Sequence, residues 1–167
     1  IQQRKELAGV YNGSFELPLT KGLFDWKISS SRHIDLSIRS TLGADRKMAL
    51  KIRFTNAEKK FRQLQQYVLL PRGEYQLTVL KRSERLAGRG RLKWFMRCAG
   101  NGELIAESNA LLPSREWEEA SFQFRVPAAS SCDAQMISLE SVGKHAFDHK
   151  LSGELWLDNI RINRIGS

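Results

Sequence analysis

The stretch Lys47-Met48-Ala49-Leu50-Lys51-Ile52-Arg53-Phe54 alternates between two kinds of side chain. The even-numbered positions are all apolar, and the odd-numbered positions are mostly basic. Because successive side chains of a β-strand point to opposite faces of a sheet, this period of two predicts a strand with one buried face and one solvated face. Strands of this kind are typical of antiparallel sheets.

The same alternation recurs along the whole chain, at residues 33–39, 74–79 and 121–126. Turn signals that contain Pro or Gly separate these segments, at residues 70–73, 88–90 and 99–102. No shift in composition marks an internal linker. The pattern therefore predicts an all-β fold, an antiparallel β-sandwich.

One segment, residues 56–66, has an asparagine that could cap a helix, followed by good helix formers. We expect at most one or two short helical turns there, followed by a strand through residues 67–69. Among the tryptophans, Trp26 and Trp117 are expected in the core. Trp156 is expected either in the core or at a ligand-binding site.

The length of 167 residues suits one domain whose core is large enough to be stable without a metal ion. We assign residues 10–165 to the sandwich and interpret residues 1–9 as a leader from a preceding region of a longer protein. That leader has no apolar signal-peptide core. No run of about 18 apolar residues, as a membrane-spanning helix requires, occurs in the sequence.

The net charge of +9 favours anionic partners, which include acidic polysaccharide, anionic lipid head groups and nucleic acid. Basic residues are densest in Lys81-Arg82-Ser83-Glu84-Arg85-Leu86-Ala87-Gly88-Arg89-Gly90-Arg91. We expect this stretch to be an arginine-rich hairpin connection. It either binds carboxylate or phosphate groups or is an ordinary solvated loop. We do not expect nucleic acid as a partner, because no motif of a nucleic-acid-binding fold is present.

The two cysteines, Cys98 and Cys132, lack the spacing of a zinc site or of a thioredoxin-like redox motif. Each lies at the end or the start of a predicted strand. If those strands are neighbours, a disulfide would close a loop of more than thirty residues and would indicate an oxidising compartment. The alternative is two buried thiols.

Five short motifs occur in an order that covers nearly the whole chain. They are Asn12-Gly13-Ser14-Phe15-Glu16, Trp26, the Pro-Gly turn and Tyr strand of residues 66–79, the Trp-to-Phe strand of residues 116–124, and Leu157-Asp158-Asn159-Ile160-Arg161-Ile162. This order resembles the galactose-binding-like jelly rolls of carbohydrate-binding modules in the family 4/9 and family 22 style. The resemblance implies a jelly roll whose first and last strands lie side by side.

In modules of that kind a structural calcium ion often lies where the first and last strands meet. The resemblance places Glu16 and Asp158 at the matching positions, with a backbone carbonyl near Gly13 or Ser14 as a further ligand. Calcium takes six to eight oxygen ligands, which carboxylates, carbonyls and water supply. The alternative is a carboxylate pair that binds arginine or backbone amides.

The resemblance also implies a sugar site built from an aromatic ring and planar polar side chains. The strand Lys93-Trp94-Phe95-Met96-Arg97-Cys98 is the strongest candidate, with Trp94, Met96 and Cys98 turned to the core. Its other face would present an exposed Phe95 flanked by Lys93 and Arg97, which suits an acidic glycan. Gln76 and Arg91 are assigned supporting roles. Alternatively, Phe95 packs under a loop.

No motif for catalysis is present: the sequence lacks a nucleophile elbow and a phosphate-binding glycine pattern. His145 and His149 flank an aspartate, but the neighbouring glycines indicate a loop and no zinc site. We therefore interpret the chain as a non-enzymatic carbohydrate-binding-like module of a larger periplasmic or extracellular protein. Its expected partners are an acidic polysaccharide and adjacent domains of its parent. The alternative is a structural sandwich that docks on its parent and does not bind glycans.

Overall fold

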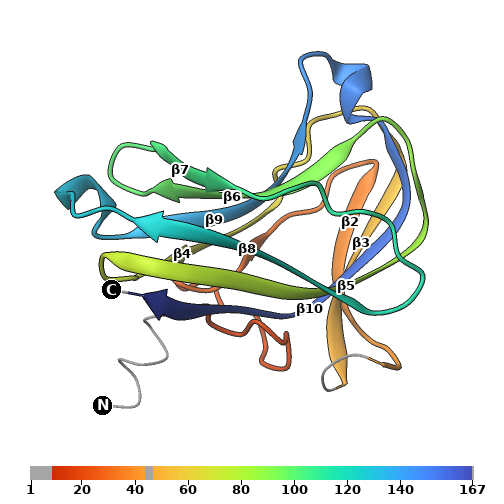
Figure 1. Ribbon diagram of the computed structural model, residues 1–167. Coiled ribbons are helices and arrows are strands. Elements are labelled where there is room, and N and C mark those ends of the chain that lie inside the picture. Colours follow the sequence, from red (N-terminus) through yellow and green to blue (C-terminus); the bar gives the residue numbers. More distant parts are fainter. Residues whose placement is uncertain (1–8, 44–46, 167) are drawn as a thin grey trace.

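The computed structural model describes residues 9–43 and 47–166, which fold into two five-stranded antiparallel sheets packed face to face (Figure 1). The first sheet contains, in spatial order, β1 (Lys27–Ile28), β4 (Leu64–Val68), β9 (Gln135–Val142), β6 (Arg91–Cys98) and β7 (Leu104–Glu107). The second sheet contains β2 (Ile34–Ser40), β3 (Met48–Ala57), β10 (Leu151–Gly166), β5 (Gly73–Ala87) and β8 (Glu118–Val126). This is the predicted antiparallel jelly-roll sandwich.

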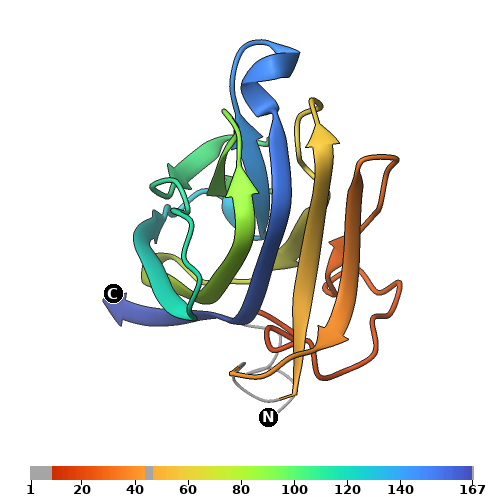
Figure 2. The same ribbon diagram turned by 90° about the vertical axis from the view of Figure 1, so that its right-hand side faces the viewer.

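The central strand of the second sheet is the last one in the chain. In Figure 2, the blue strand β10 runs between the yellow-orange strand β3 and the green strand β5. Its 16 residues pair with β3 through one half and with β5 along most of their length. The alternating segments predicted for residues 33–39, 47–54, 74–79 and 121–126 correspond to β2, β3, β5 and β8.

Helical structure is confined to two 3-10 turns in the described residues, η1 (Ser130–Cys132) and η2 (Ala146–His149). None of the described helices is long and apolar enough to cross a membrane. No helical turn forms within residues 56–66: β3 ends at Ala57, β4 begins at Leu64, and residues 58–63 between them are irregular. The backbone N–H of Phe61 donates to Ser141 Oγ (2.7 Å), and Ser141 N–H donates to the Phe61 carbonyl (3.0 Å), which holds the segment against β9.

Apolar side chains from both sheets fill the space between them. Trp94, Met96 and Cys98 of β6 are at most 3% exposed and belong to this core, as their alternation predicts. Trp26 is also in the core, and its indole N–H donates to the Asn12 carbonyl (3.1 Å). The prediction for Trp117 is wrong: it is partly exposed and donates to the Leu42 carbonyl at the molecular surface.

The start of the described chain lies beside the last strand, as expected, but it is a turn and not a strand. Ile160 N–H donates to the Gly13 carbonyl at 2.9 Å. A Cβ atom at Gly13 would lie 1.9 Å from the Ile160 carbonyl oxygen, so only glycine permits this approach. The first and last parts of the sandwich therefore lie side by side, as predicted.

The arginine-rich stretch of residues 81–91 is not a loop. Strand β5 continues through Ala87 and β6 begins at Arg91, so only residues 88–90 form the turn. The strand persists because Lys81 and Ser83 face inward and are buried. Lys81 Nζ donates to the Leu112 carbonyl (2.6 Å), which satisfies the charged group in the interior.

The structure joins Cys98 and Cys132 in the expected disulfide, with their Cα atoms 4.4 Å apart. The bridge links the end of β6 to η1 across 34 residues of sequence. Both cysteines are buried, so the bridge is part of the core. It replaces the alternative of two free thiols, since no free cysteine occurs in the described chain.

Candidate functional site

The outward face of the first sheet carries one aligned row of polar and aromatic side chains across all five strands. Strand register pairs Lys27 with Gln65, Gln65 with Ser138, Ser138 with Phe95, and Phe95 with Glu107. Directly paired residues of antiparallel strands share one face of a sheet. The row therefore runs from β1 to β7 on the side opposite the core, and we call this surface the row face.

Two aromatic rings lie on the row face, and each has a cation against it. Lys27 Nζ lies 4.9 Å from the ring centre of Tyr67, and Arg97 Cζ lies 5.0 Å from that of Phe95. Two strand spacings separate β4 from β6, which places the backbones that carry the two rings roughly 10 Å apart. The face thus offers two apolar ring surfaces, each next to a positive charge.

Phe95 is on the predicted face, but it is not the exposed ring that we expected. It is 9% exposed and yet lies outside the core cluster. Arg97 stacks on its ring and covers part of it. Tyr67 is the more accessible of the two rings, because it is only partly buried.

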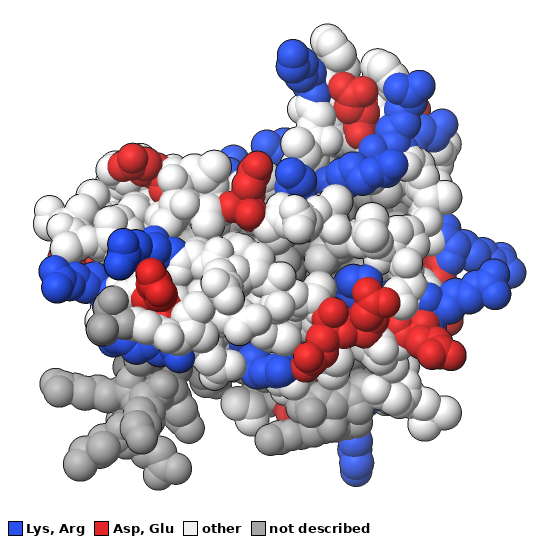
Figure 3. Space-filling view, in the orientation of Figure 1, with Lys and Arg blue, Asp and Glu red and all other residues white. Residues whose placement is uncertain are grey.

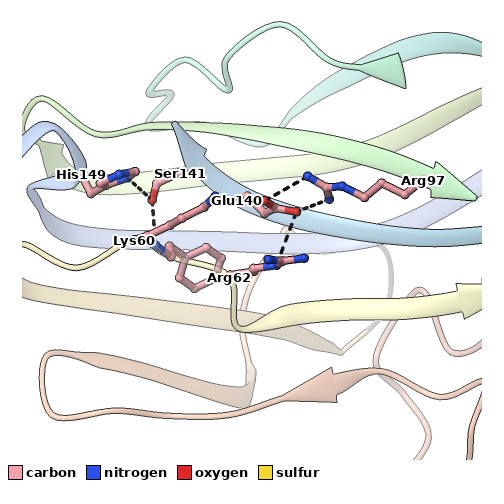
Figure 4. A network of polar contacts seen from close by, with 7 residues as sticks. Lys60, Arg62, Arg97, Glu140, Ser141 and His149 are labelled. Carbon is pink, nitrogen blue, oxygen red and sulfur yellow. Dashed lines mark hydrogen bonds and ion pairs between the residues drawn. The ribbon is translucent and has the colours of Figure 1, made fainter. Parts of the chain in front are cut away.

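The charged centre of the row face is Glu140 of β9, whose side chain is 1% exposed. Three cations surround its carboxylate: Arg97 Nη1 donates to Oε2, Lys60 Nζ lies 3.6 Å from Oε1, and Arg62 Nε lies 3.9 Å from Oε2. Figure 4 shows the three side chains approaching Glu140 from β6 and from the segment before β4. One negative charge therefore holds three positive charges together.

The environment of Glu140 keeps it ionised. Burial raises the pKa of this carboxyl, but the hydrogen bond and charge of Arg97, together with the Arg62 charge, lower it by more. The net result is a pKa below the ordinary glutamate value. The cation cluster on the row face therefore stays assembled at neutral pH.

A buried hydrogen-bond chain fixes the segment that carries Lys60 and Arg62. Ser141 Oγ accepts the Phe61 N–H and lies 2.7 Å from Nδ1 of His149, which is 6% exposed (Figure 4). Because Ser141 Oγ already accepts the Phe61 N–H, its own hydroxyl hydrogen can be donated to an unprotonated His149 Nδ1. His149 therefore has a structural role. The loop predicted around His145 and His149 contains the 3-10 turn η2.

The structure brings together only part of the predicted sugar site. Lys93 shares the row face with Phe95 and Arg97, and its Nζ lies 3.7 Å from Glu107. Arg91 continues the same face, but its guanidinium donates to the carbonyls of the turn at residues 88–90. Gln76 is not near this group, because it lies on β5 of the second sheet and donates to Ser121 Oγ (3.1 Å).

The two carboxylates predicted to bind calcium each accept backbone N–H groups. Glu16 Oε1 accepts from Lys47 (2.6 Å) and Met48 (3.2 Å) at the start of β3. Asp158 is fully buried on β10, and its Oδ1 accepts from Asn159. The described residues contain no group of three or more His, Cys, Asp or Glu side chains that could hold a metal ion. Calcium binding at Glu16 and Asp158 stays a prediction.

Five residues on or beside the row face were not predicted from the sequence: Lys27, Lys60, Arg62, Tyr67 and Glu140. Tyr67 alternates with Leu64, Gln66 and Val68, which are buried, and that alternation could have placed it on the outer face. The other residues have no local signal, because only strand pairing brings them together.

The sequence matches no protein-family model. It also matches no curated protein. Solved structures do match its fold. A CBM4 carbohydrate-binding module aligns with a TM-score of 0.67 and 14% identity, over 93% of this chain and 99% of that one.

Two further structures align with similar TM-scores, identities and coverage. The CBM22-1 xylan-binding domain of Xyn10C from Paenibacillus barcinonensis has a TM-score of 0.61 and 16% identity, and the alignment covers 96% of this chain and 95% of that one. A putative sugar-binding protein from Bacteroides thetaiotaomicron has a TM-score of 0.63 and 14% identity, with 92% of this chain and 98% of that one covered. The described chain therefore has the galactose-binding-like jelly-roll fold of carbohydrate-binding modules.

Proposed function

We propose that the chain is a non-catalytic module that binds an acidic polysaccharide on the row face. The ring of Tyr67, together with the part of Phe95 that Arg97 leaves uncovered, would contact the apolar faces of sugar rings. Lys27, Lys93 and Arg97 would bind carboxylate or sulfate substituents, and Glu140 would position Arg97. The similarity in fold to carbohydrate-binding modules supports this class of ligand.

The observation that carries the proposal is the pairing of each ring with a cation, at 4.9 Å for Lys27 on Tyr67 and 5.0 Å for Arg97 on Phe95. A uronic acid presents an apolar C–H surface and a carboxylate on the same ring, and these two features match a ring and a neighbouring cation. A neutral glycan would use only the aromatic half of such a pair.

We place the module in the periplasm or outside the cell, as part of a larger protein. The buried Cys98–Cys132 disulfide supports this location, because disulfides persist in oxidising compartments. The second candidate function is a structural sandwich that docks on an adjacent domain of its parent. That candidate predicts no affinity for any glycan.

The proposal is tested with a glycan array that contains uronic-acid, sulfated and neutral polysaccharides, at low and high salt and with and without calcium. We expect binding to acidic members that weakens with salt, because exposed charge pairs are screened. Binding to no glycan under any condition would favour the docking function.

A matched pair of variants then locates the site. Tyr67→Ala removes a partly buried ring from the row face, and Phe147→Ala removes a ring that is 48% exposed on the turn η2. We expect Tyr67→Ala to weaken binding at least tenfold and Phe147→Ala to leave it unchanged. Equal affinity of both variants would place the glycan elsewhere on the module.

A further inference from the structure

A second basic site lies on the other sheet, away from the row face. Residues 82–86 of β5 and residues 113–115 of the connection into β8 line a hollow of about 560 Å³, which we call the arginine hollow. Three of its lining residues are arginines: Arg82, Arg85 and Arg115. The stretch of residues 81–91 in the sequence therefore contributes two arginines from a strand and not from a loop.

The arginine hollow has an excess of positive charge. Its three guanidinium groups face a single lining carboxylate, Glu84, which pairs with Arg82 (2.6 Å). Arg85 and Arg115 are exposed and form no ion pair with any other described residue. With three arginines and one glutamate, the residues that line the hollow thus carry a net excess of two positive charges.

Charge alone does not distinguish this hollow, since Lys and Arg side chains are spread over the visible surface among Asp and Glu (Figure 3). What distinguishes it is the fixed geometry of its arginines. The Arg82 guanidinium lies near two indole rings, 5.3 Å from the centre of that of Trp156 and 5.8 Å from that of Trp117. Its Nε is buried and has no hydrogen-bond partner.

A bulge fixes the backbone conformation of Arg85. The pairing of β5 with β10 shifts register between Ser152 and Glu154, and Arg85 adopts a left-handed backbone with φ of 52°. A Cβ atom at the facing Gly153 would lie 2.3 Å from the Arg85 carbonyl oxygen. A non-glycine residue in this region is uncommon, and its strain is maintained only where the surrounding structure imposes it.

Hydrogen bonds between its two walls make the arginine hollow rigid. Ser83 N–H donates to the Ser114 carbonyl (2.6 Å), and Ser114 N–H donates to Ser83 Oγ (2.8 Å). The segment that carries Arg115 is thereby fixed to the strand that carries Arg82 and Arg85. The backbone segments that carry the three arginines are consequently held around one space.

We propose that the arginine hollow binds a tetrahedral oxyanion, as a sulfate or phosphate monoester. Guanidinium groups bind such anions through paired N–H donors. The two uncompensated charges match the charge of a phosphate monoester, and they exceed that of a sulfate monoester. This proposal does not depend on the row face, so either site can fail without the other.

The test is a titration of the 15N-labelled chain with sodium sulfate, followed by amide chemical shifts, with sodium chloride at equal ionic strength as the reference. We expect saturable shifts that centre on residues 82–86 and 113–115 with sulfate alone. Shifts that are equal with chloride, or that are spread over all basic surfaces, would overturn the proposal.

Two double variants with the same change in net charge separate the site from general attraction. Arg85→Gln with Arg115→Gln removes the two unpaired arginines of the hollow. Lys21→Gln with Arg125→Gln removes two exposed cations outside the hollow lining. We expect the first pair to raise the Kd for sulfate at least tenfold and the second to change it less than twofold. Equal effects would contradict the site.

Binding of glucose 6-sulfate, glucose 6-phosphate and glucose is then compared, to show which kind of ester the hollow prefers. Tighter binding of the sulfate ester than of the phosphate ester would indicate a sulfated glycan, and the reverse order would indicate a phosphorylated ligand. Either order supports the site, whereas no preference of either ester over glucose would overturn it. The double variant Arg85→Lys with Arg115→Lys keeps the charge but loses the paired N–H donors. We expect its affinity for sulfate to lie between those of the wild type and of the double glutamine variant.

Discussion

Glu140 of β9 pairs with Arg97 of β6, although Arg97 is not the residue directly opposite. Strand register places Lys93 opposite Glu140, and Arg97 opposite Met136. Lys93 is instead paired with Glu107 on the other neighbouring strand. Arg97 therefore reaches along the row face to Glu140, and it brings its guanidinium over the ring of Phe95 on the way.

The first prediction concerns the pH dependence of stability. Because the folded-state pKa of Glu140 is lowered, its ionised form stabilises the fold above the ordinary glutamate pKa, and this stabilisation is lost as the pH falls through the lowered value. We expect Glu140→Gln to reduce the free energy of unfolding at pH 7 by about 1–3 kcal/mol, as for a hydrogen bond to a charged group. The difference from wild type should shrink towards pH 3 in urea titrations. A constant difference across that range would show that the charge of Glu140 does not matter.

The second prediction compares two phenylalanines. Phe95 is 9% exposed on the outer face, whereas Phe61 is 1% exposed in the core. We expect Phe95→Ala to cost about 1–3 kcal/mol, and Phe61→Ala about 3–5 kcal/mol, because only the second leaves a closed cavity. Urea unfolding measures both. An equal cost would assign Phe95 to the core and remove it from the proposed glycan surface.

The third prediction concerns the bridge between β6 and η1. Replacing Cys98 and Cys132 together by serine should lower the free energy of unfolding by about 2–4 kcal/mol, since the unfolded chain gains freedom. Wild type in a reducing agent should approach the same stability once the buried bridge is reduced. An unchanged denaturation midpoint in both experiments would contradict a stabilising bridge.

The fourth prediction uses two glycines beside β10. A Cβ at Gly13 would lie 1.9 Å from the Ile160 carbonyl oxygen, whereas one at Gly9 would lie 4.0 Å from the Ile162 carbonyl oxygen. We expect Gly13→Ala to detach the turn from β10 and to cost about 1–3 kcal/mol through steric overlap. Gly9→Ala should be neutral. Limited proteolysis, with cleavage near residue 13 in the first variant alone, measures the detachment.

The fifth prediction tests calcium. If Glu16 and Asp158 share an ion, calcium in excess over EDTA should raise the Tm, because a ligand at 100 times its Kd stabilises the folded state by about 2.7 kcal/mol. Glu16→Gln keeps an oxygen that can accept the amides of Lys47 and Met48, and it should abolish the calcium effect. The same Tm in calcium and in EDTA for the wild type would exclude the site.

Period-two alternation was enough to predict the class of fold and one side of β6. Trp94, Met96 and Cys98 are in the core as predicted, because local alternation determines sidedness once a strand is buried on one face. The exposure of Phe95 could not be predicted in this way. It depends on Arg97 and on the neighbouring strands, whose pairing has no local signal.

Two errors have a shared physical cause. Residues 56–66 have good helix formers, yet they contain no helical turn. Residues 81–87 have the composition of a solvated loop, yet they continue strand β5. Tertiary contacts override these preferences: Phe61 exchanges hydrogen bonds with Ser141, and Lys81 reaches the Leu112 carbonyl. Gln76 was assigned to the same site as Phe95 because nothing in the sequence indicates that β5 and β6 belong to different sheets.

The central position of β10 has a consequence for biosynthesis. Within the second sheet, β2 pairs only with β3 and β8 only with β5, and β10 alone joins these two halves. Residues 151–166 must therefore emerge from the ribosome before the second sheet can close. The strands of the first sheet and both cysteines come earlier in the chain. A nascent chain that stops before β10 would thus expose two unpaired strand edges, which makes this interval the stage of synthesis most vulnerable to aggregation.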